Sequence, residues 1–381
     1  MENRRLVMIP GPTPVVRSIQ EQMGREVAAF GDPGFVQDFK NLLADLKSLW
    51  QCAGEVFVVA GTGTMAMEMA VANATKAGDN MLIVSHGFFG DRFIDLCSRK
   101  GLNVDVLECA WGDIVPVTAI EAKLAEKPYA AITVTHVDTA TGVCAPVEEI
   151  GAMIRAKFPD TLYIVDGVCA TAGECERVDP WNIDILFTGS QKAFGVAPGL
   201  MMLWAGERAM ARRASLGTIP EFYIDFDKWL PIMQDPGKYY ATPAINMVWA
   251  LKESVRIIKE EGLDARFARH RKISAAMRAA MAELGIIPLA KEGLRAVTLS
   301  NLLYPEGVDD AAFRAALLAE GVIVAGGLGA YAGKMFRLGH MGNVDTHELV
   351  ATVAAVERAL HKTGVQVEFG KALGAFQRAM I

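Results

Sequence analysis

The sequence predicts an α/β fold, in which a large domain with a mostly parallel sheet precedes a smaller α+β domain. From about residue 55, short β-rich runs alternate with stretches of helical periodicity. These runs are apolar throughout, as expected for strands that are covered on both faces in a parallel sheet. After about residue 240 the pattern changes to long amphipathic helices and shorter strands, which indicates a second domain.

The chain is expected to begin with a rigid extended arm. The segment Pro10-Gly11-Pro12-Thr13-Pro14 can form neither a helix nor a central strand, because proline fixes φ and lacks the N–H group. We place the arm at residues 1–15, the large domain at residues 16–260 and the small C-terminal domain at residues 261–381.

The alternating region of the large domain predicts seven strands. They are expected at residues 56–60, 81–85, 104–108, 130–135, 162–166, 183–188 and 200–204. Helical patterns lie between most of them, at residues 64–76, 89–99, 117–126 and 147–158. Sheets of this kind place ligands at the carboxyl ends of their strands.

The C-terminal part is expected to begin with two long helices, at residues 245–260 and 264–284, which are separated at Gly262. Shorter elements follow. They are a strand at residues 296–303, a helix at 310–320, a strand at 322–324 and a final helix at 346–363.

Composition and charge exclude several classes of protein. Of the 381 residues, 52 % are apolar and 22 % are charged, which suits a large folded core. The net charge of −6 gives no general attraction for nucleic acid, and no run approaches the roughly 18 apolar residues of a membrane helix. The six cysteines are scattered without a CxxC pair, and the six histidines lack metal-ligand spacing. We therefore expect reduced thiols, a cytoplasmic protein and no metal site.

A Gly/Thr turn after the first strand is a candidate phosphate site. In Gly61-Thr62-Gly63-Thr64 a strand leads into a helix, whose free N–H groups and dipole suit an anion. The same glycines are also compatible with a tight turn that binds nothing. The run Gly61-x-Gly63-x-x-Ala66 fits the dinucleotide fingerprint as well, but the next strand ends without the acid that would hold a ribose, which disfavours a nicotinamide cofactor.

Asp166 and Lys192 follow two later strands. Asp166 ends an apolar strand, so its carboxylate is expected at the ligand edge, although it could simply cap the next turn. Lys192 lies just after the next strand, where desolvation can make a lysine nucleophilic; the alternative is an ordinary surface lysine. A phosphate site, a carboxylate and a lysine at one sheet edge are the groups that pyridoxal phosphate needs.

Seven motifs then extend this interpretation over about 90 % of the chain, and together they resemble the class V pyridoxal-phosphate-dependent aminotransferases of fold type I, in the alanine–glyoxylate / serine–pyruvate aminotransferase group. They are Gly63-Thr64-Met65-Ala66-Met67-Glu68, His86-Gly87-Phe88-Phe89-Gly90-Asp91-Arg92, Thr139-Ala140-Thr141-Gly142, Val165-Asp166, Gly189-Ser190-Gln191-Lys192, Tyr239-Tyr240-Ala241-Thr242-Pro243 and Gly333-Lys334-Met335-Phe336-Arg337-Leu338-Gly339.

The resemblance implies roles for individual residues. Lys192 matches the lysine that forms the Schiff base with pyridoxal phosphate and transfers the proton, and Asp166 matches the acid that faces the pyridine nitrogen. Arg337 matches the arginine that binds the substrate carboxylate. The other matching positions are Thr62, Gly63, Thr64 and Gln191 at the phosphate, Tyr239 and Thr242 reaching it from the other subunit of a homodimer, Phe89 and Val168 on the two ring faces, Thr139 near the 3′ oxygen and the substrate, and Gly11 on the substrate side.

The resemblance also implies the reaction. We expect an aminotransferase that moves the amino group of alanine or serine to glyoxylate or pyruvate in a ping-pong cycle. The alternatives are a 2-aminoethylphosphonate–pyruvate or ureidoglycine–glyoxylate transaminase, and less so a lyase or desulfurase of this fold, because no cysteine follows Cys175. Relatives often carry an asparagine where Thr13 and Pro14 stand, and a His-Arg pair where residues 30–35 precede a helix expected near Asp38. These departures leave the substrate open.

Overall fold

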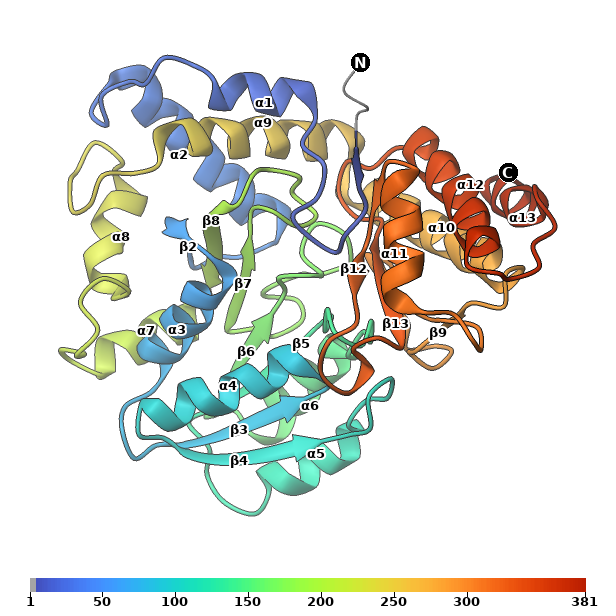
Figure 1. The fold of residues 1–381 in the computed structure, drawn as a ribbon. Coiled ribbons are helices and arrows are strands. Elements are labelled where there is room, and N and C mark those ends of the chain that lie inside the picture. The colour runs from blue at the N-terminus through green and yellow to red at the C-terminus, as the bar shows by residue number, and fades with distance from the viewer. Residues whose placement is uncertain (1–4) are drawn as a thin grey trace.

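The computed structural model describes residues 5–381, which form two lobes (Figure 1). Residues 1–4 of the predicted arm lie outside the described residues. The large lobe is built on a seven-stranded sheet in which β8 runs antiparallel to both neighbours and the other pairs are parallel. The spatial order is β2 (Glu55–Gly61), β8 (Gly199–Ala205), β7 (Ile185–Gly189), β6 (Leu162–Asp166), β5 (Ala131–Thr135), β3 (Asn80–Ser85) and β4 (Asn103–Glu108).

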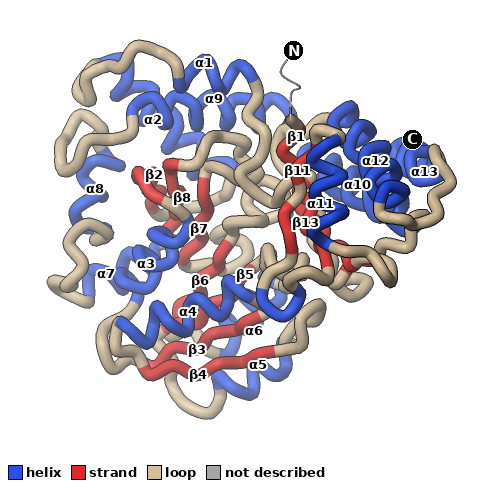
Figure 2. The backbone as a smooth tube through the Cα atoms, viewed as in Figure 1, coloured by secondary structure: helices blue, strands red, loops and turns tan. Residues whose placement is uncertain are grey.

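These strands confirm the predicted α/β fold. All seven predicted strands form, and each end lies within two residues of its predicted position. The helices between them pack on both faces of the sheet (Figure 2), because right-handed connections run first toward the β4 edge and then back from it. These helices are α3 (Gly63–Ala74), α4 (Phe88–Arg99), α5 (Val117–Leu124) and α6 (Val147–Lys157).

Five further helices complete the large lobe: α1 (Arg17–Met23), α2 (Pro33–Leu49), α7 (Glu207–Ser215), α8 (Phe226–Gln234) and α9 (Ile245–Glu261). The expectation that α2 starts near Asp38 was wrong. The helix begins five residues earlier, because Asp32 caps its first turn by accepting a hydrogen bond from the Phe35 N–H at 3.0 Å and Pro33 suits the first helical position.

The small lobe holds a four-stranded antiparallel sheet in the order β12 (Ala325–Gly326), β13 (Met335–Gly339), β10 (Leu299–Leu303) and β9 (Ile287–Pro288). The strand β1 (Leu6–Val7) joins this lobe by pairing in parallel with β11 (Val322–Ile323). Its helices are α10 (Leu263–Ala282), α11 (Asp310–Ala319), α12 (Thr346–Lys362) and α13 (Lys371–Met380), with a 3-10 turn at Gly329–Tyr331. The prediction that the helix ending near residue 363 is the last one was therefore wrong, since α13 follows it and packs on α10.

Each lobe has its own hydrophobic core. The arrowheads of β3 and β4 point toward the side of the small lobe (Figure 1), and β5, β6 and β7 run parallel to them, whereas β8 runs the opposite way. The carboxyl ends of the parallel strands, where the candidate site residues were expected, therefore face the junction of the two lobes. No helix within residues 5–381 is long and apolar enough to span a bilayer.

Candidate active site

A cavity of 170 Å³ lies at the carboxyl edge of the large sheet, and most of the predicted cofactor residues line it. The ends of β2, β5, β6 and β7 contribute to its walls together with the first turns of α3 and α4. The lining residues are Thr62, Gly63, Thr64, Met67, Phe89, Arg92, Thr135, Val137, Thr139, Asp166, Val168, Cys169, Gln191 and Lys192.

Lys192 lies in the turn after β7, and its side chain is buried between the sheet edge and the N-terminal arm. Its Nζ donates a hydrogen bond to the Pro10 carbonyl at 2.7 Å. Gly11 lies directly against this side chain: a Cβ atom there would come within 2.5 Å of Lys192 Cδ and 2.7 Å of Nζ, and its φ of +130° also favours glycine. The structure thus brings Gly11 and Lys192 together, although they are far apart in the sequence.

Asp166 ends β6, the strand next to β7, and is almost completely buried. Its Oδ1 accepts a hydrogen bond from the Val168 N–H at 2.9 Å. Burial raises the pKa of its carboxyl from 3.8 to about 7, and the nearby positive charge of Lys192 only partly opposes this. Within residues 5–381 no basic side chain forms an ion pair with Asp166, so the site offers an uncompensated acceptor for a cationic group.

The first turn of α3 lies at the cavity, where the sequence predicts an anion site. Thr62 is the N-cap in an extended conformation, and its side chain does not cap the helix, so the first N–H groups stay open to the cavity. Gly63 allows close packing here, because a Cβ atom would come within 2.8 Å of Val168 Cγ2. Gln191 extends the same wall, and the N-terminal arm fixes its backbone through a hydrogen bond from the Thr13 N–H at 3.0 Å.

Phe89 lies in the first turn of α4 and lines the cavity, and two residues that the sequence interpretation did not select support it. The buried Asp138 accepts a hydrogen bond from the Phe89 N–H at 2.9 Å. Arg92 places its guanidinium carbon 4.8 Å from the centroid of the Phe89 ring and donates to Thr64 Oγ1 at 2.8 Å. Arg92 was detectable in principle, because it follows Phe89 by one helical turn. Asp138 reaches Phe89 from the loop after β5, and no local signal reveals that contact.

Arg337 lies beside this cavity on β13, outside its lining. Burial lowers the pKa of its guanidinium, and its Nε donates to the Gly326 carbonyl at 2.7 Å. Its cross-strand partner Asn301 donates to the Thr139 carbonyl at 3.2 Å, which connects β13 and β10 to the cavity wall. No carboxylate within residues 5–381 forms an ion pair with Arg337, so its guanidinium can still bind an external one.

Tyr239 and Thr242 do not line the cavity of their own chain. The Tyr239 side chain is 62 % exposed, and its hydroxyl lies 3.5 Å from Thr242 Oγ1 in the segment before α9. Their position outside the cavity of their own chain is what we expect if both residues act on the site of another subunit.

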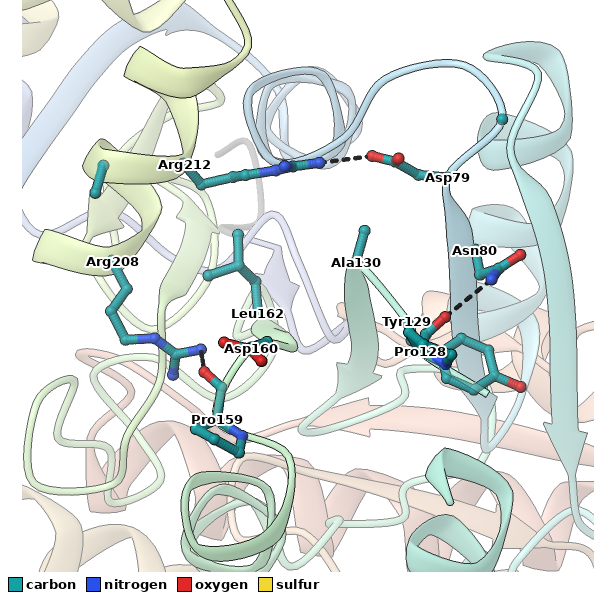
Figure 3. A pocket seen from close by; sticks show the side chains of 12 residues that line it. Asp79, Asn80, Pro128, Tyr129, Ala130, Pro159, Asp160, Leu162, Arg208 and Arg212 are labelled. Carbon is teal, nitrogen blue, oxygen red and sulfur yellow. Dashed lines mark hydrogen bonds and ion pairs between the residues drawn. The ribbon is translucent and has the colours of Figure 1, made fainter. Parts of the chain in front are cut away.

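A larger pocket of 540 Å³ lies at the opposite edge of the sheet, where β3, β5 and β6 begin (Figure 3). Its two arginines already have partners: Arg212 pairs with Asp79 at 2.7 Å, and Arg208 donates to the Thr161 carbonyl at 3.0 Å. Although larger, this pocket has no counterpart to the buried lysine and carboxylate, Lys192 and Asp166, of the smaller cavity.

Comparisons with known proteins show which family the chain resembles. The model of the family "Aminotransferase class-V" matches residues 24–344. An uncharacterized aminotransferase of Methanocaldococcus jannaschii is 36 % identical over 96 % of this chain and 95 % of its own, and a serine–glyoxylate aminotransferase of Hyphomicrobium methylovorum is 33 % identical over 97 % and 93 %. The crystal structure of the ureidoglycine–glyoxylate aminotransferase from Bacillus subtilis superposes with a TM-score of 0.94, covering 100 % of this chain and 98 % of that one at 29 % identity.

Proposed function

The chain belongs to the class V aminotransferases, which use pyridoxal phosphate, and we propose that it transfers the amino group of alanine or serine to glyoxylate or pyruvate. The observation that carries this proposal is the convergence of Lys192, Asp166 and the first turn of α3 on one cavity, with the unpaired Arg337 beside it. A small amino acid fits the proposal because Arg337, which forms no ion pair with a carboxylate within residues 5–381, can bind its carboxylate.

The residues around the cavity fit pyridoxal phosphate. The open N–H groups of α3 suit its phosphate, and the raised pKa of Asp166 indicates a carboxylate that gains from a protonated ring nitrogen. Phe89 and Val168 offer two apolar surfaces for a flat ring. When bound, pyridoxal phosphate supplies an aldehyde that captures amines and a ring that delocalises the electron pair left when a Cα proton departs.

The chain's own residues would then divide the work. Lys192, whose side chain lines the cavity, would take the proton from the substrate Cα at its Nζ and deliver it to the cofactor carbon that carried the aldehyde oxygen. Asp166 keeps a proton on the ring nitrogen through its negative charge. Arg337 binds both oxygens of the substrate carboxylate and so orients the Cα–H bond. The arm at Gly11 covers Lys192 and limits the access of water.

A ureidoglycine donor is the second candidate. It is supported by the structural similarity to the Bacillus subtilis enzyme over the whole chain. Such a donor also carries a carboxylate next to the reacting carbon, so the proposed role of Arg337 is the same for both. The part of the site that would distinguish the two donors is the substrate side. There, Thr13, Pro14 and residues 30–35 depart from the family pattern.

We further propose a cytoplasmic homodimer with shared sites. The six cysteines are all unpaired, as expected in a reducing compartment. The exposed aromatic ring of Tyr239 supports a partner that covers it.

The test is a donor screen combined with a label. Purified protein is assayed with alanine, serine, aspartate and ureidoglycine against glyoxylate and pyruvate, and the cofactor is fixed by borohydride and located by peptide mapping. We expect alanine or serine to be the best donor and the label to fall on Lys192. A label on another lysine would contradict the site, whereas a preference for ureidoglycine would replace only the substrate.

A further inference from the structure

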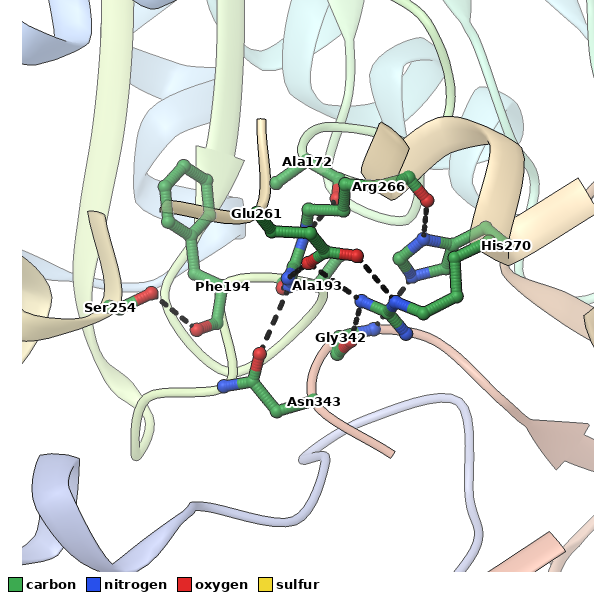
Figure 4. A network of polar contacts seen from close by, with 10 residues as sticks. Ala172, Ala193, Phe194, Ser254, Glu261, Arg266, His270, Gly342 and Asn343 are labelled. Carbon is green, nitrogen blue, oxygen red and sulfur yellow. Dashed lines mark hydrogen bonds and ion pairs between the residues drawn. The ribbon is translucent and has the colours of Figure 1, made fainter. Parts of the chain in front are cut away.

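A buried arginine, Arg266, lies in the first turn of α10 and contacts the turn that carries Lys192 (Figure 4). We propose that Arg266 is a positioning residue for Lys192: it fixes the backbone next to this lysine and ties it to the small lobe. The inference rests on the proposed role of Lys192. It assigns a role to a residue that lies outside the cavity and belongs to none of the seven motifs.

Arg266 binds acceptors from four separate segments, although its side chain has no solvent exposure. Its Nη2 donates to the Ala193 carbonyl at 2.7 Å, one residue after Lys192. Its Nε donates to the Ala172 carbonyl at 2.9 Å, in the loop that follows Asp166 and β6. The other two acceptors are Glu261 Oε2 at 2.7 Å, at the end of α9, and Asn343 Oδ1 at 3.3 Å, in the loop after β13.

A buried guanidinium needs this set of acceptors. Burial lowers the pKa of Arg266 to about 10, so the group still carries its charge at neutral pH. An unpaired charge is costly inside a protein, and the network is complete only while all four segments stay in place. Lysine cannot replace it, because three donors on one nitrogen do not reach acceptors that lie around a planar fork.

Other contacts restrain the same turn from its remaining sides. Ser254 Oγ, on α9, donates to the Phe194 carbonyl at 2.6 Å, and Thr13 Oγ1 donates to the Lys192 carbonyl at 2.8 Å. On the small-lobe side, His270 Nδ1 donates to the Arg266 carbonyl at 2.8 Å while its Nε2 accepts from the Gly342 N–H at 2.9 Å. Hydrogen bonds to the backbone of this turn therefore fix the position of Lys192. Through Arg266, the turn is linked to both lobes.

The test compares Arg266→Lys with Arg269→Lys. Arg269 lies on the same helix, shares Glu261 and donates to the Gly342 carbonyl at 2.9 Å, but within residues 5–381 it forms no hydrogen bond with the Lys192 turn. We expect Arg266→Lys to lower kcat by about 10- to 100-fold, because small misplacements of a proton-transferring group have effects of this size, while KM for the donor changes by less than about threefold. The rate at which cofactor-free protein regains its visible band with added pyridoxal phosphate should fall as well. Arg269→Lys should leave kcat and this rate within about twofold of the wild type.

Ser254→Ala provides a second variant, since it removes one hydrogen bond to the same turn and only a small side chain. We expect the same change in kcat, with a smaller size, and an unchanged KM. The proposal is overturned if Arg266→Lys lowers only the melting temperature, if Arg269→Lys lowers kcat equally, or, where Arg266→Lys does not fold, if Ser254→Ala leaves kcat and the capture rate unchanged. A borohydride label that misses Lys192 in the wild type would instead overturn the proposed site itself.

Discussion

At the scale of single residues, substitutions of Arg337 can test substrate binding separately from cofactor chemistry. Its guanidinium has no carboxylate partner within residues 5–381, and the proposed substrates all present one. Removing a charged partner from such a site costs roughly 2–5 kcal/mol, which corresponds to a loss of about 30- to several-thousand-fold in kcat/KM. We expect Arg337→Lys near the lower limit, because lysine keeps the charge but not the planar fork, and Arg337→Ala near the upper limit.

The measurement is kcat/KM for alanine and for an amine without a carboxylate, in the wild type and in both variants. The visible band of the bound cofactor should persist in all of them. If Arg337→Ala slows both substrates equally, the carboxylate is bound elsewhere and the proposed substrate class loses its main support.

The buried carboxyl group of Asp166 predicts a pH dependence of the free energy of unfolding. Burial raises the pKa of its carboxyl from 3.8 to about 7, so the folded cofactor-free protein binds this proton more tightly than the unfolded chain does. The free energy of unfolding must therefore fall as the pH rises from about 4 to about 7, and by up to about 4 kcal/mol from this group. Asp166→Asn should lose this part of the dependence, which urea unfolding of both cofactor-free proteins across that range will measure. Parallel curves for the two proteins would show that the carboxyl is not perturbed.

At the scale of elements, the N-terminal arm is the segment whose contact with the site can be tested most directly. A Cβ atom on Gly11 would come within 2.5 Å of the Lys192 side chain, so Gly11→Ala must displace either the arm or the lysine. We expect kcat/KM to fall by about 100-fold or more, since displacements of about 1 Å have such effects. The matched control is Gly24→Ala, because a Cβ atom there would come no closer than 3.8 Å to its neighbours, which is ordinary van der Waals contact. Equal activity of the two variants would mean that the arm does not hold Lys192 in place.

The elements that the sequence predicted well are those with a strong local pattern. The buried strands of the large sheet are apolar along their whole length, and Asp166 was expected at a strand end because that strand stops in an acid. The helix α13 was missed because ten residues form a stable helix only when they pack on a neighbour, here α10. The strand β13 was missed for a similar reason: it is stabilised by pairing with β10.

The predicted domain limits stay predictions, because one helix packs in the cores of both lobes. The boundary was placed at residue 261, but Leu263 and Phe267 at the start of α10 pack in the core of the large lobe, and the same helix packs in the small core from Ile273 onward. The contacts of Arg266 and Asp138 could not be predicted either, because each joins segments that only the folded chain brings together.

On the scale of the whole molecule, the aromatic surface around Tyr239 supports the proposed homodimer with shared sites. Tyr239 is 62 % exposed, and its ring packs at a tilt against Phe30 with a centroid distance of 5.0 Å. Phe222 is 66 % exposed and packs edge-on against the neighbouring Tyr240. Exposed aromatic residues grouped in this way are typical of an interface. In a two-fold dimer, each chain would supply Tyr239 and Thr242 to the site of its partner.

This arrangement predicts complementation between two inactive variants. Lys192→Ala loses the lysine of its own site, and the double variant Tyr239→Ala, Thr242→Ala would damage the site of its partner. In a mixed dimer one site then carries both defects, whereas the other combines an intact Lys192 with intact Tyr239 and Thr242. Random exchange of equal amounts should therefore restore about a quarter of the wild-type activity, because half of the dimers are mixed and each has one intact site of two. The measurement is activity after the two purified variants are unfolded and refolded together, with sedimentation to verify dimers and each variant refolded alone as the control. If the mixture gains nothing over the separate proteins, or if wild-type protein is fully active as a monomer, Tyr239 and Thr242 act within their own chain or not at all.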